Sequence, residues 1–572
     1  MSKKYLLALI ALVVTVACTD PLAIANQNDP DRTRVFANPA DLQVFVAGLF
    51  AVMHQSTLGG NNDDLETQMM VMGMENTSTL ANFAMGPRGS IPRNPITNQR
   101  GSQGSAGNYH DWFRGHRAAR QAALAIAALN QLSLGSAAAD ARARAFARFV
   151  QGIALGDLSL AYDSASILTE NDNPQADAAV VVPLSGYQAV NTVALQYLDS
   201  AIAIATANPT AFPLPVVPNF WINGIGMTQA QFIQLVRSYK ARCRADVART
   251  PAERAAVDWT QVIADANAGI TVDFAPSMDP TNGWDVVWVV QHFTTGAAAW
   301  HQMSQFWLGM ADTSGGYAAW LNTPLNLRTP FLVVSPDRRL PGGANCLAPC
   351  SVVARTAQGA AAGTGNSGQP FANTPYFRNR PSGSDVSGDP LQISMYDFWR
   401  SRAFRQANRI GPYPILTAAE IRLLAAEGYL RTGNFPAAIS RINASRDTNT
   451  ATGKGKLPPL LATAVDTTTV PGTAVNCVPK VPDPAQAYKG TRCGNTWDAL
   501  KYEYRMETAY TSYGAWFFAG RGWGDLPEKT ATQWPVPFQE MDARRQTFYG
   551  FGGGGPSSSA AGNYGLFLGG VY

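Results

Sequence analysis

Helical periodicity in two separate blocks of the chain is the feature that most limits how it can fold. Apolar and small side chains recur at helical spacing in the first block. They predict helices over residues 39–54, 109–132, 137–162, 187–207, 228–249 and 260–270. The pattern resumes at Thr417 and predicts another helix over 497–518. Asn38 before Pro39 has the order of an N-cap and a first helical residue. The sequence therefore predicts a mainly α fold.

The clearest helical pair lies in residues 417–446, "TAAEIRLLAAEGYLRTGNFPAAISRINASR". Six of its residues follow the spacing of a tetratricopeptide-type hairpin: Ala426, Tyr429, Gly433, Phe435, Ala438 and Ile442. The small residues allow two helices to approach closely, and Gly433-Asn434 supplies the turn between them. We therefore expect a tetratricopeptide-like helical hairpin here.

The two helical blocks are separated by residues 271–414, which are rich in Gly, Pro, Asn and aromatic residues and show no regular period. Loops longer than about 15 residues are uncommon in compact domains unless they serve a function. A second irregular stretch covers 447–496, and a Gly/Ser-rich tail follows residue 550. The prediction is a helical scaffold that carries long irregular loop insertions.

The N-terminus has the pattern of an export signal. Lys3 and Lys4 precede a run of thirteen largely apolar residues, 5–17. Such a helix spans roughly 20 Å, less than the ~30 Å hydrocarbon core of a bilayer, so a signal segment is favoured over a membrane span. Val16-Ala17-Cys18 resembles a bacterial lipobox, although Thr15 replaces the usual aliphatic residue. Residues 1–17 are therefore predicted as a lipoprotein signal peptide and Cys18 as the lipidation site; a cysteine near a cleavage site by chance is the alternative.

Composition limits which kinds of protein the mature chain can be. After residue 18, no stretch reaches 18 consecutive apolar residues, so we expect a water-soluble body on a lipid anchor. The net charge is +4, only 15% of residues are charged, and no block of Lys and Arg occurs. Nucleic acid is therefore not an expected partner.

Five cysteines remain after Cys18. Cys346 and Cys350 lie four residues apart in one loop, and Cys477 and Cys493 bracket another, so each pair is a possible disulfide in an oxidising compartment. Cys243 is left on a predicted helix, where we expect a buried and inert thiol. A zinc site built from the four loop cysteines is the alternative, but no CxxC pair and no neighbouring His supports it.

Motifs of catalysis are scarce. The sequence has no His-Glu-x-x-His and no Gly-x-Ser-x-Gly, and the GxGxxG pattern at 363–368 has no strand before it. Asp63, Asp64 and Glu66 form an acidic cluster that is typical of a polar loop. Two carboxylates for glycoside hydrolysis can still converge from distant positions. We expect no cofactor, no metal and no catalytic activity.

Aromatic residues crowd a short window at the start of the irregular region: Trp284, Trp288, Phe293, Trp300, Phe306, Trp307, Tyr317 and Trp320. An exposed ring face suits the apolar face of a sugar or a peptide side chain, whereas a buried ring belongs to the core. Near-helical spacing favours packing for Trp300, Phe306 and Trp307. The candidate ligand contacts are Trp284, Trp288, Tyr317 and Trp320, with core packing as the alternative.

Five blocks occur in a recognisable order: "NDPDRTRVFANPADLQVFVAGLF", "SYKARCRADVA", the hairpin of 417–446, "EYRMETAYTSYGAWF" and "WPVPFQEMD". The hairpin ends in N-x-x-R at Asn443 to Arg446, and the last block contains P-x-P-x-x-E from Pro535 to Glu540. Together they resemble the SusD/RagB family of outer-membrane nutrient-binding lipoproteins over nearly the whole mature length. Residues 513–516 depart from the family's Glu-Gly-x-Arg.

The resemblance implies a single SusD-like domain over 18–572. Its parts would be a helical part over about 38–270, a loop-rich ligand-binding insertion over about 271–414, C-terminal hairpins and loops over 415–550, and the tail 551–572. The ligand site would draw on about 63–100 and 282–320. In the first of these stretches Arg93 and Asn94 are the candidate hydrogen-bond donors, and Asp64 is a further candidate contact.

The resemblance also implies a function. The protein would be a surface-exposed, lipid-anchored outer-membrane protein that captures oligosaccharides or oligopeptides. It would deliver them to a SusC-like TonB-dependent transporter. Two alternatives stay open: a surface glycan hydrolase or peptidase on a helical scaffold, and a purely structural lipoprotein in which every tryptophan of the aromatic window is buried.

Overall fold

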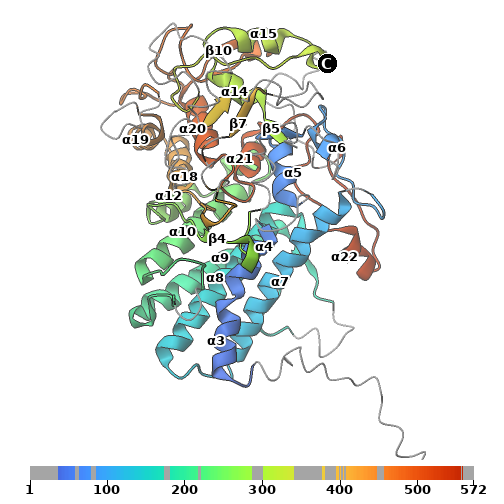
Figure 1. Ribbon diagram of the computed structural model, residues 1–572, viewed down its shortest axis with the longest axis vertical. Coiled ribbons are helices and arrows are strands. Elements are labelled where there is room, and N and C mark those ends of the chain that lie inside the picture. Colours follow the sequence, from blue (N-terminus) through green and yellow to red (C-terminus); the bar gives the residue numbers. More distant parts are fainter. Residues whose placement is uncertain are drawn as a thin grey trace, which may run out of the picture.

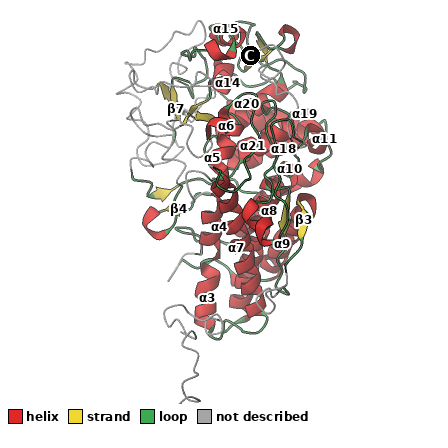
Figure 2. Cartoon of the chain, turned by 90° about the vertical axis from the view of Figure 1, so that its right-hand side faces the viewer, coloured by secondary structure: helices red, strands yellow, loops and turns green. Residues whose placement is uncertain are grey.

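Helices form most of the structure, and among the described residues strands occur only in two-stranded pairs (Figures 1 and 2). The computed structural model describes residues 36–57, 64–78, 85–102, 104–172, 181–216, 221–286, 301–340, 376–379, 394–398, 400, 404, 407–447, 457–555 and 557. The predicted mainly α fold is confirmed. Within the described ranges, no helix combines the length and apolar character needed to cross a bilayer.

The helices of the N-terminal half are α3 (Pro39–Ala47), α4 (Leu49–Thr57), α5 (Leu65–Met72), α6 (Met85–Gly89), α7 (Ser105–Leu129), α8 (Ala137–Ala161), α9 (Tyr187–Ala207), α10 (Gln229–Asp246), α11 (Pro251–Ala255) and α12 (Trp259–Asn267). The later helices are α14 (Gln305–Leu308), α15 (Gly316–Asn322), α18 (Ala418–Arg431), α19 (Phe435–Arg446), α20 (Thr496–Thr508), α21 (Ala515–Trp523) and α22 (Phe538–Ala543).

The strands pair antiparallel: β1 (Asn76–Ser78) with β5 (His301–Met303), β2 (Ser164–Ser166) with β3 (Leu184–Gly186), β4 (Ser277–Met278) with β8 (Gly411–Pro412), β6 (Phe377–Asn379) with β7 (Tyr396–Phe398), and β9 (Lys480–Pro482) with β10 (Thr491–Cys493).

Small residues set the spacing of the helices in the lower half of Figure 1. At Gly152 in α8, an added Cβ would lie 2.7 Å from the Leu198 Cγ of α9. At Gly156, it would lie 2.8 Å from the Sγ of Cys243 in α10. Close-packed interiors leave no room for these extra atoms. Cys243 is buried with a free thiol, as predicted.

The predicted hairpin of 417–446 is confirmed as α18 and α19. The side chain of Thr417 accepts a hydrogen bond from the Glu420 N–H and caps α18. Gly433 adopts φ 76°, the left-handed conformation that ends the helix, and Asn434 caps α19 by accepting from the Ala437 N–H.

The single helix predicted over 497–518 is wrong, because the structure breaks it into α20 and α21. Two buried carboxyl groups accept hydrogen bonds from backbone N–H groups in the break: Glu75 accepts from Tyr510 at 2.6 Å, and Glu66 accepts from Gly514 at 2.6 Å. Both acceptors come from the N-terminal part of the chain, so local periodicity could not reveal this break. The helix predicted over 39–54 is likewise divided at Gly48.

Glu75 makes folding stability dependent on pH. Burial raises the pKa of its carboxyl to about 8, although the hydrogen bond from the Tyr510 N–H opposes the shift. The folded chain therefore keeps a proton that the unfolded chain releases above about pH 4.5, so this group makes folding less favourable as pH rises. Glu75→Gln removes the ionisable group and keeps an acceptor oxygen.

We expect the free energy of unfolding of Glu75→Gln to rise relative to the natural protein by about 1.4 kcal/mol per pH unit between pH 5 and 8. Urea unfolding at pH 5, 6.5 and 8 measures it. Asp41→Asn, which removes an exposed carboxyl, serves as the control. A difference between Glu75→Gln and the natural protein that stays constant with pH would show that Glu75 is already ionised in the folded state.

Candidate functional site

The two stretches that the family resemblance implied for ligand binding lie side by side. Strand β1 follows α5, and it pairs with β5 of the mid-chain region, with Asn76 opposite Met303. The backbone carbonyl of Glu75 accepts from the Ser304 N–H at 3.3 Å and from the indole N–H of Trp307 at 3.0 Å. Residues far apart in sequence therefore form one structural unit here.

The aromatic candidates of this unit are buried rather than exposed. Trp284 is 7% exposed, Tyr317 1% and Trp320 4%. Trp284 stacks between Phe50 and His54, with ring centroids 6.0 and 5.1 Å away. The burial of these three residues agrees with the core-packing alternative, because the rings pack against the helical scaffold and against one another. Their role in ligand binding stays a prediction.

Other residues of the aromatic window complete this description. Phe306 and Trp307 are buried, as predicted from their spacing. The Trp320 ring packs edge-on against Phe306 at 4.6 Å, and the Arg328 guanidinium lies 4.6 Å from the Trp320 ring centroid. Trp288, Phe293 and Trp300 lie outside the described residues, as do Cys18, Cys346 and Cys350.

The polar candidates of the first stretch have structural partners. Arg93 is buried and donates to the backbone carbonyls of Val71 and Met72 at the C-terminal end of α5, at 3.1 and 3.2 Å. Asp64 is buried and accepts from His110 and Arg114 at 3.1 and 3.2 Å. Among the candidates Arg93, Asp64 and Asn94, only Asn94 is exposed, and its side-chain amide donates to the Ser90 hydroxyl.

An open pocket of about 130 Å³ lies elsewhere, where the β9–β10 hairpin meets α20 in the upper part of Figure 1. Its walls combine apolar, aromatic and charged side chains: Met310, Val481, Pro482, Pro484, Tyr488, Arg492, Asp498, Lys501, Arg505 and Asp525. We call it the hairpin pocket. A cleft that mixes apolar walls with a few fixed polar groups has the general make-up of a small-molecule site.

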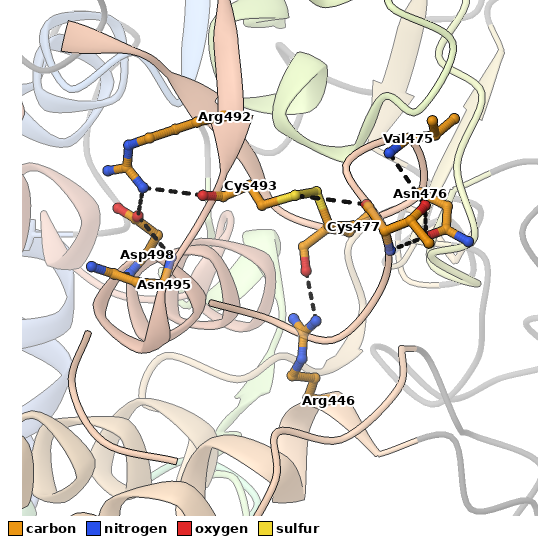
Figure 3. Close-up of a disulfide and its surroundings, with 10 residues drawn as sticks. Arg446, Val475, Asn476, Cys477, Arg492, Cys493, Asn495 and Asp498 are labelled. Atoms are coloured by element: carbon orange, nitrogen blue, oxygen red, sulfur yellow. Dashed lines mark hydrogen bonds and ion pairs between the residues drawn. A yellow bond between two sulfur atoms is a disulfide. The ribbon is translucent and has the colours of Figure 1, made fainter. Parts of the chain in front are cut away.

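A disulfide ties the hairpin to the chain before it. Cys477 and Cys493 are bonded, as predicted, and the bond closes a loop with a sequence separation of 16 (Figure 3). The loop contains the turn that carries Tyr488. This disulfide also excludes Cys477 and Cys493 as thiolate ligands, which removes the four-cysteine zinc site. In the described part of the chain, no group of three or more potential ligand side chains is placed to hold a metal.

The turn holds the half-buried Tyr488 in a sparsely populated conformation. Ala487 and Tyr488 have φ of 49° and 60°, which non-glycine residues adopt only at a cost of roughly 1–2 kcal/mol each. Asp483 stabilises the turn, since its backbone carbonyl accepts from the Tyr488 N–H at 2.8 Å and its carboxylate accepts from the Ala485 N–H at 3.0 Å. Backbone strain of this kind collects at functional sites.

Two ion-pair groups fix the charged wall. The carboxylate of Asp498 accepts from Arg492 at 3.1 Å and from the Asn495 N–H at 3.0 Å (Figure 3). The carboxylate of Asp525, in the turn after α21, accepts from Lys501 and Arg505 of α20, both at 2.8 Å. Burial raises the pKa of Asp525, but the Lys501 and Arg505 charges outweigh burial and hold that pKa below its ordinary value.

The wall therefore carries three cations and two carboxylates. Planar guanidinium and carboxylate groups in fixed positions can donate and accept hydrogen bonds in defined directions. The half-buried Tyr488 ring adds a surface for an apolar face. This arrangement suits a neutral ligand that is rich in hydroxyl groups.

Sequence reasoning missed the hairpin pocket. The signal that could have indicated this pocket is the cysteine pair, Cys477 and Cys493. The segment "CVPKVPDPAQAYKGTRC" between them places an Asp-Pro turn and a tyrosine inside a closed loop. The contributions of Asp525 and Met310 carry no comparable signal, since tertiary packing alone brings them to the hairpin.

The chain matches no protein-family model and no curated protein. Several solved structures are similar to it. A SusD superfamily protein from Bacteroides vulgatus is 10% identical, with 86% of this chain and 89% of that chain covered and a TM-score of 0.46. A SusD superfamily protein from Bacteroides thetaiotaomicron is 12% identical, with coverages of 84% and 90% and a TM-score of 0.47. The surface glycan-binding protein A from Bacteroides uniformis is 14% identical, with coverages of 90% and 94% and a TM-score of 0.45.

The first two of these structures are SusD superfamily proteins, the group that the five sequence blocks resemble. With identities of 10–14% and TM-scores below 0.5, they do not assign a ligand or a partner to this chain.

The disulfide should matter for the stability of the hairpin. Closing a loop of about 15 residues is worth roughly 3 kcal/mol in the chain-entropy model. We therefore expect Cys477→Ser/Cys493→Ser to lower the free energy of unfolding by about 2–3 kcal/mol in urea titrations. Cys243→Ser, at the buried free thiol, is the comparison that leaves the loop closed. Equal stability of the double variant and the natural protein would show that packing alone holds the hairpin.

Proposed function

We propose that this protein is a surface nutrient-binding lipoprotein that captures oligosaccharides in the hairpin pocket. It delivers them to a SusC-like TonB-dependent transporter in the outer membrane. The observation that carries the proposal is the pocket itself: a tyrosine ring on a disulfide-closed turn faces a wall of ion-paired side chains. A pre-formed site of this kind loses little conformational entropy on binding.

The charge of the hairpin pocket favours a sugar over a peptide. Each carboxylate in the wall already has cationic partners, Arg492 for Asp498 and Lys501 with Arg505 for Asp525. The remaining field is weak, so a ligand gains mainly from directed hydrogen bonds and ring contact. Hydroxyl groups both donate and accept, which matches a wall that contains both cationic donors and carboxylate acceptors. Oligopeptide capture is the other ligand class that the test below distinguishes.

Binding without catalysis fits the same wall. Glycoside hydrolysis needs a carboxylic acid that stays protonated beside a second carboxylate. In the hairpin pocket the pKa of Asp525 is held down by Lys501 and Arg505, although burial alone would raise it. A surface hydrolase or peptidase would need its acids at another place.

Attachment to the membrane rests on the N-terminal sequence. Cys18 ends the predicted signal segment, and several acyl chains at ~0.8 kcal/mol per buried CH₂ hold a protein stably on a bilayer. The helical hairpin of α18 and α19 offers a rigid surface for a transporter.

Ligand titrations test the binding proposal. The soluble body, residues 19–572, is titrated by calorimetry against a panel of oligosaccharides and oligopeptides, and each mixture is checked for breakdown products. We expect saturable oligosaccharide binding without breakdown. Tyr488→Ala should weaken binding about two- to tenfold, in line with ~0.5–1.5 kcal/mol for a ring contact, whereas Tyr488→Phe keeps the ring and most of the affinity.

Trp284→Ala is the comparison arm of that titration, with its melting temperature recorded because the ring is buried. Loss of binding in a folded Trp284→Ala, together with an unaffected Tyr488→Ala, would move the ligand to the mid-chain site that the family resemblance implied. Breakdown products that survive repurification would contradict the binding-only function.

Lipidation is tested separately. Cys18→Ser removes the only acceptor that the lipobox-like motif offers. In a bacterial host that has an outer membrane, we expect the natural chain in the membrane fraction, with a mass increase from its acyl chains. The Cys18→Ser chain should appear in the soluble fraction. Cys243→Ser is the control, and membrane retention of Cys18→Ser without lipid would overturn the anchor.

A further inference from the structure

A second cavity lies on the helical hairpin and shares no residue with the hairpin pocket. Its volume is about 290 Å³. One face of α18 forms a wall through Ala418, Arg422 and Ala425, which follow one another at helical spacing. The C-terminal end of α12 and the residues after it, 266–271, form the opposite wall, and Arg441 of α19 closes one side. We call it the arginine pocket.

The charge of the arginine pocket is one-sided. Its lining contains two arginines and no carboxylate. Arg422 donates to the hydroxyl of Ser445 at 2.7 Å, and Arg441 donates to the side-chain carbonyl of Asn267 at 2.6 Å, so both of these partners are neutral. Among the described residues, neither guanidinium forms an ion pair, and the buried Nε of Arg422 has no hydrogen-bond partner. Each guanidinium therefore keeps donors for a further acceptor.

The arginines of the neighbouring helices differ from Arg422 and Arg441 because they form ion pairs. Arg242 and Arg254 are paired with Glu420 and Glu427, on α18 itself, and Arg431 is paired with Glu427. Two acids lie near the arginine pocket. Asp265 is paired with Arg237, Lys240 and Arg244, and Asp273 accepts from the Ala418 N–H at 2.9 Å, a neutral donor that does not cancel its charge. Among the described residues neither acid forms an ion pair with Arg422 or Arg441, so both guanidinium groups can still pair with a further carboxylate.

The position of Arg441 is fixed before any ligand arrives. Its guanidinium lies 4.7 Å from the ring centroid of Tyr429, and the hydroxyl of that ring accepts from the Asn267 side-chain amide at 2.8 Å. Asn267 in turn accepts from Arg441. The rest of the lining is mostly small or apolar, and Val272, next to the pocket, is 74% exposed. A pair of fixed guanidinium groups beside small apolar walls fits a carboxylate on a short aliphatic stem.

We propose that the arginine pocket binds an acidic segment of a protein partner, with Arg422 and Arg441 holding one Asp or Glu carboxylate. The apolar walls contact the methylene groups of that side chain, and Val272 contacts an apolar neighbour in the same segment. Charge complementarity selects the partner segment, and the fixed helices α12, α18 and α19 set its position. The proposal goes beyond sugar capture, because it assigns recognition of a protein to a separate face.

A labelled acidic peptide tests this inference. The probe is acetyl-(Ala-Glu)₄-amide with a fluorescent label, measured by anisotropy against the soluble body at low salt. A peptide with Gln in place of every Glu is the neutral comparison. We expect binding of the acidic peptide only, with affinity that falls as salt is added, since screening weakens charge pairs at a pocket open to solvent. Arg422→Gln/Arg441→Gln should weaken binding at least tenfold.

A matched control removes the same charge elsewhere. Arg117→Gln/Arg545→Gln changes two exposed arginines that line neither pocket, so it should bind the acidic peptide like the natural protein. Arg441→Gln alone, at the partly exposed side of the pocket, is the second variant if the double one does not fold, and we expect at least a threefold loss. Melting temperatures confirm folding in each case.

Four results would overturn the proposal: no binding of the acidic peptide to the natural protein, equal binding of the neutral peptide, equal weakening by the control variant, and unchanged binding by a folded Arg422→Gln/Arg441→Gln. Displacement of the peptide by inorganic phosphate at equal concentration would also overturn it, because it would indicate a general anion site. Sugar titrations of the same variants keep the two proposals separate. Loss of sugar binding in Tyr488→Ala with normal peptide binding shows that one site can fail without the other.

Discussion

Two glutamates on one helix join the two halves of the scaffold. Glu420 and Glu427 lie two turns apart on α18, and each receives an arginine from the N-terminal block. Arg242 of α10 donates to both oxygens of Glu420 at 2.7 and 2.9 Å, and Arg254 of α11 donates to both oxygens of Glu427 at 3.0 and 2.7 Å. All four side chains are buried, and Arg242 and Glu420 have no other ion-pair partner among the described residues, so removing either one would leave an uncompensated charge and cost roughly 3–5 kcal/mol. The two pairs set the position of α18 against α10 and α11.

Buried ion pairs also position the helix that carries the wall of the hairpin pocket. Arg446 at the end of α19 and Arg339 from the mid-chain region both bind Glu503 of α20. Helix α20 also carries Lys501 and Arg505, which hold Asp525 in the pocket wall. The pocket is therefore built on a helix whose position is set by buried ion pairs, while the disulfide fixes the hairpin that closes it. The arginine pocket uses the opposite arrangement on α18 and α19, where two arginines have neutral partners only.

The helical part of the fold could be predicted because its information is local. Periodicity located α7 to α10 and the α18–α19 hairpin within a few residues, and the turn at Gly433 followed from its sequence. The break between α20 and α21 could not be predicted, because its N–H groups are taken by Glu66 and Glu75 from another part of the chain. The candidate site was predicted in part: the segments that form β1 and β5 do meet. The sequence left open whether Trp284, Tyr317 and Trp320 are exposed or packed in the core, because composition shows that aromatic rings are present but not which neighbours cover them.

By itself, the sequence determined the mainly α class, the hairpin, the Cys477–Cys493 bracket and the resemblance to SusD/RagB proteins, since each depends on spacing along the chain. Only the tertiary structure decided which charges compensate one another. It surrounded Asp525 with cations, paired Glu420 and Glu427 with distant arginines, and left Arg422 and Arg441 with neutral partners. Burial and distance set the energy of a charge, and both arise only when remote segments pack together.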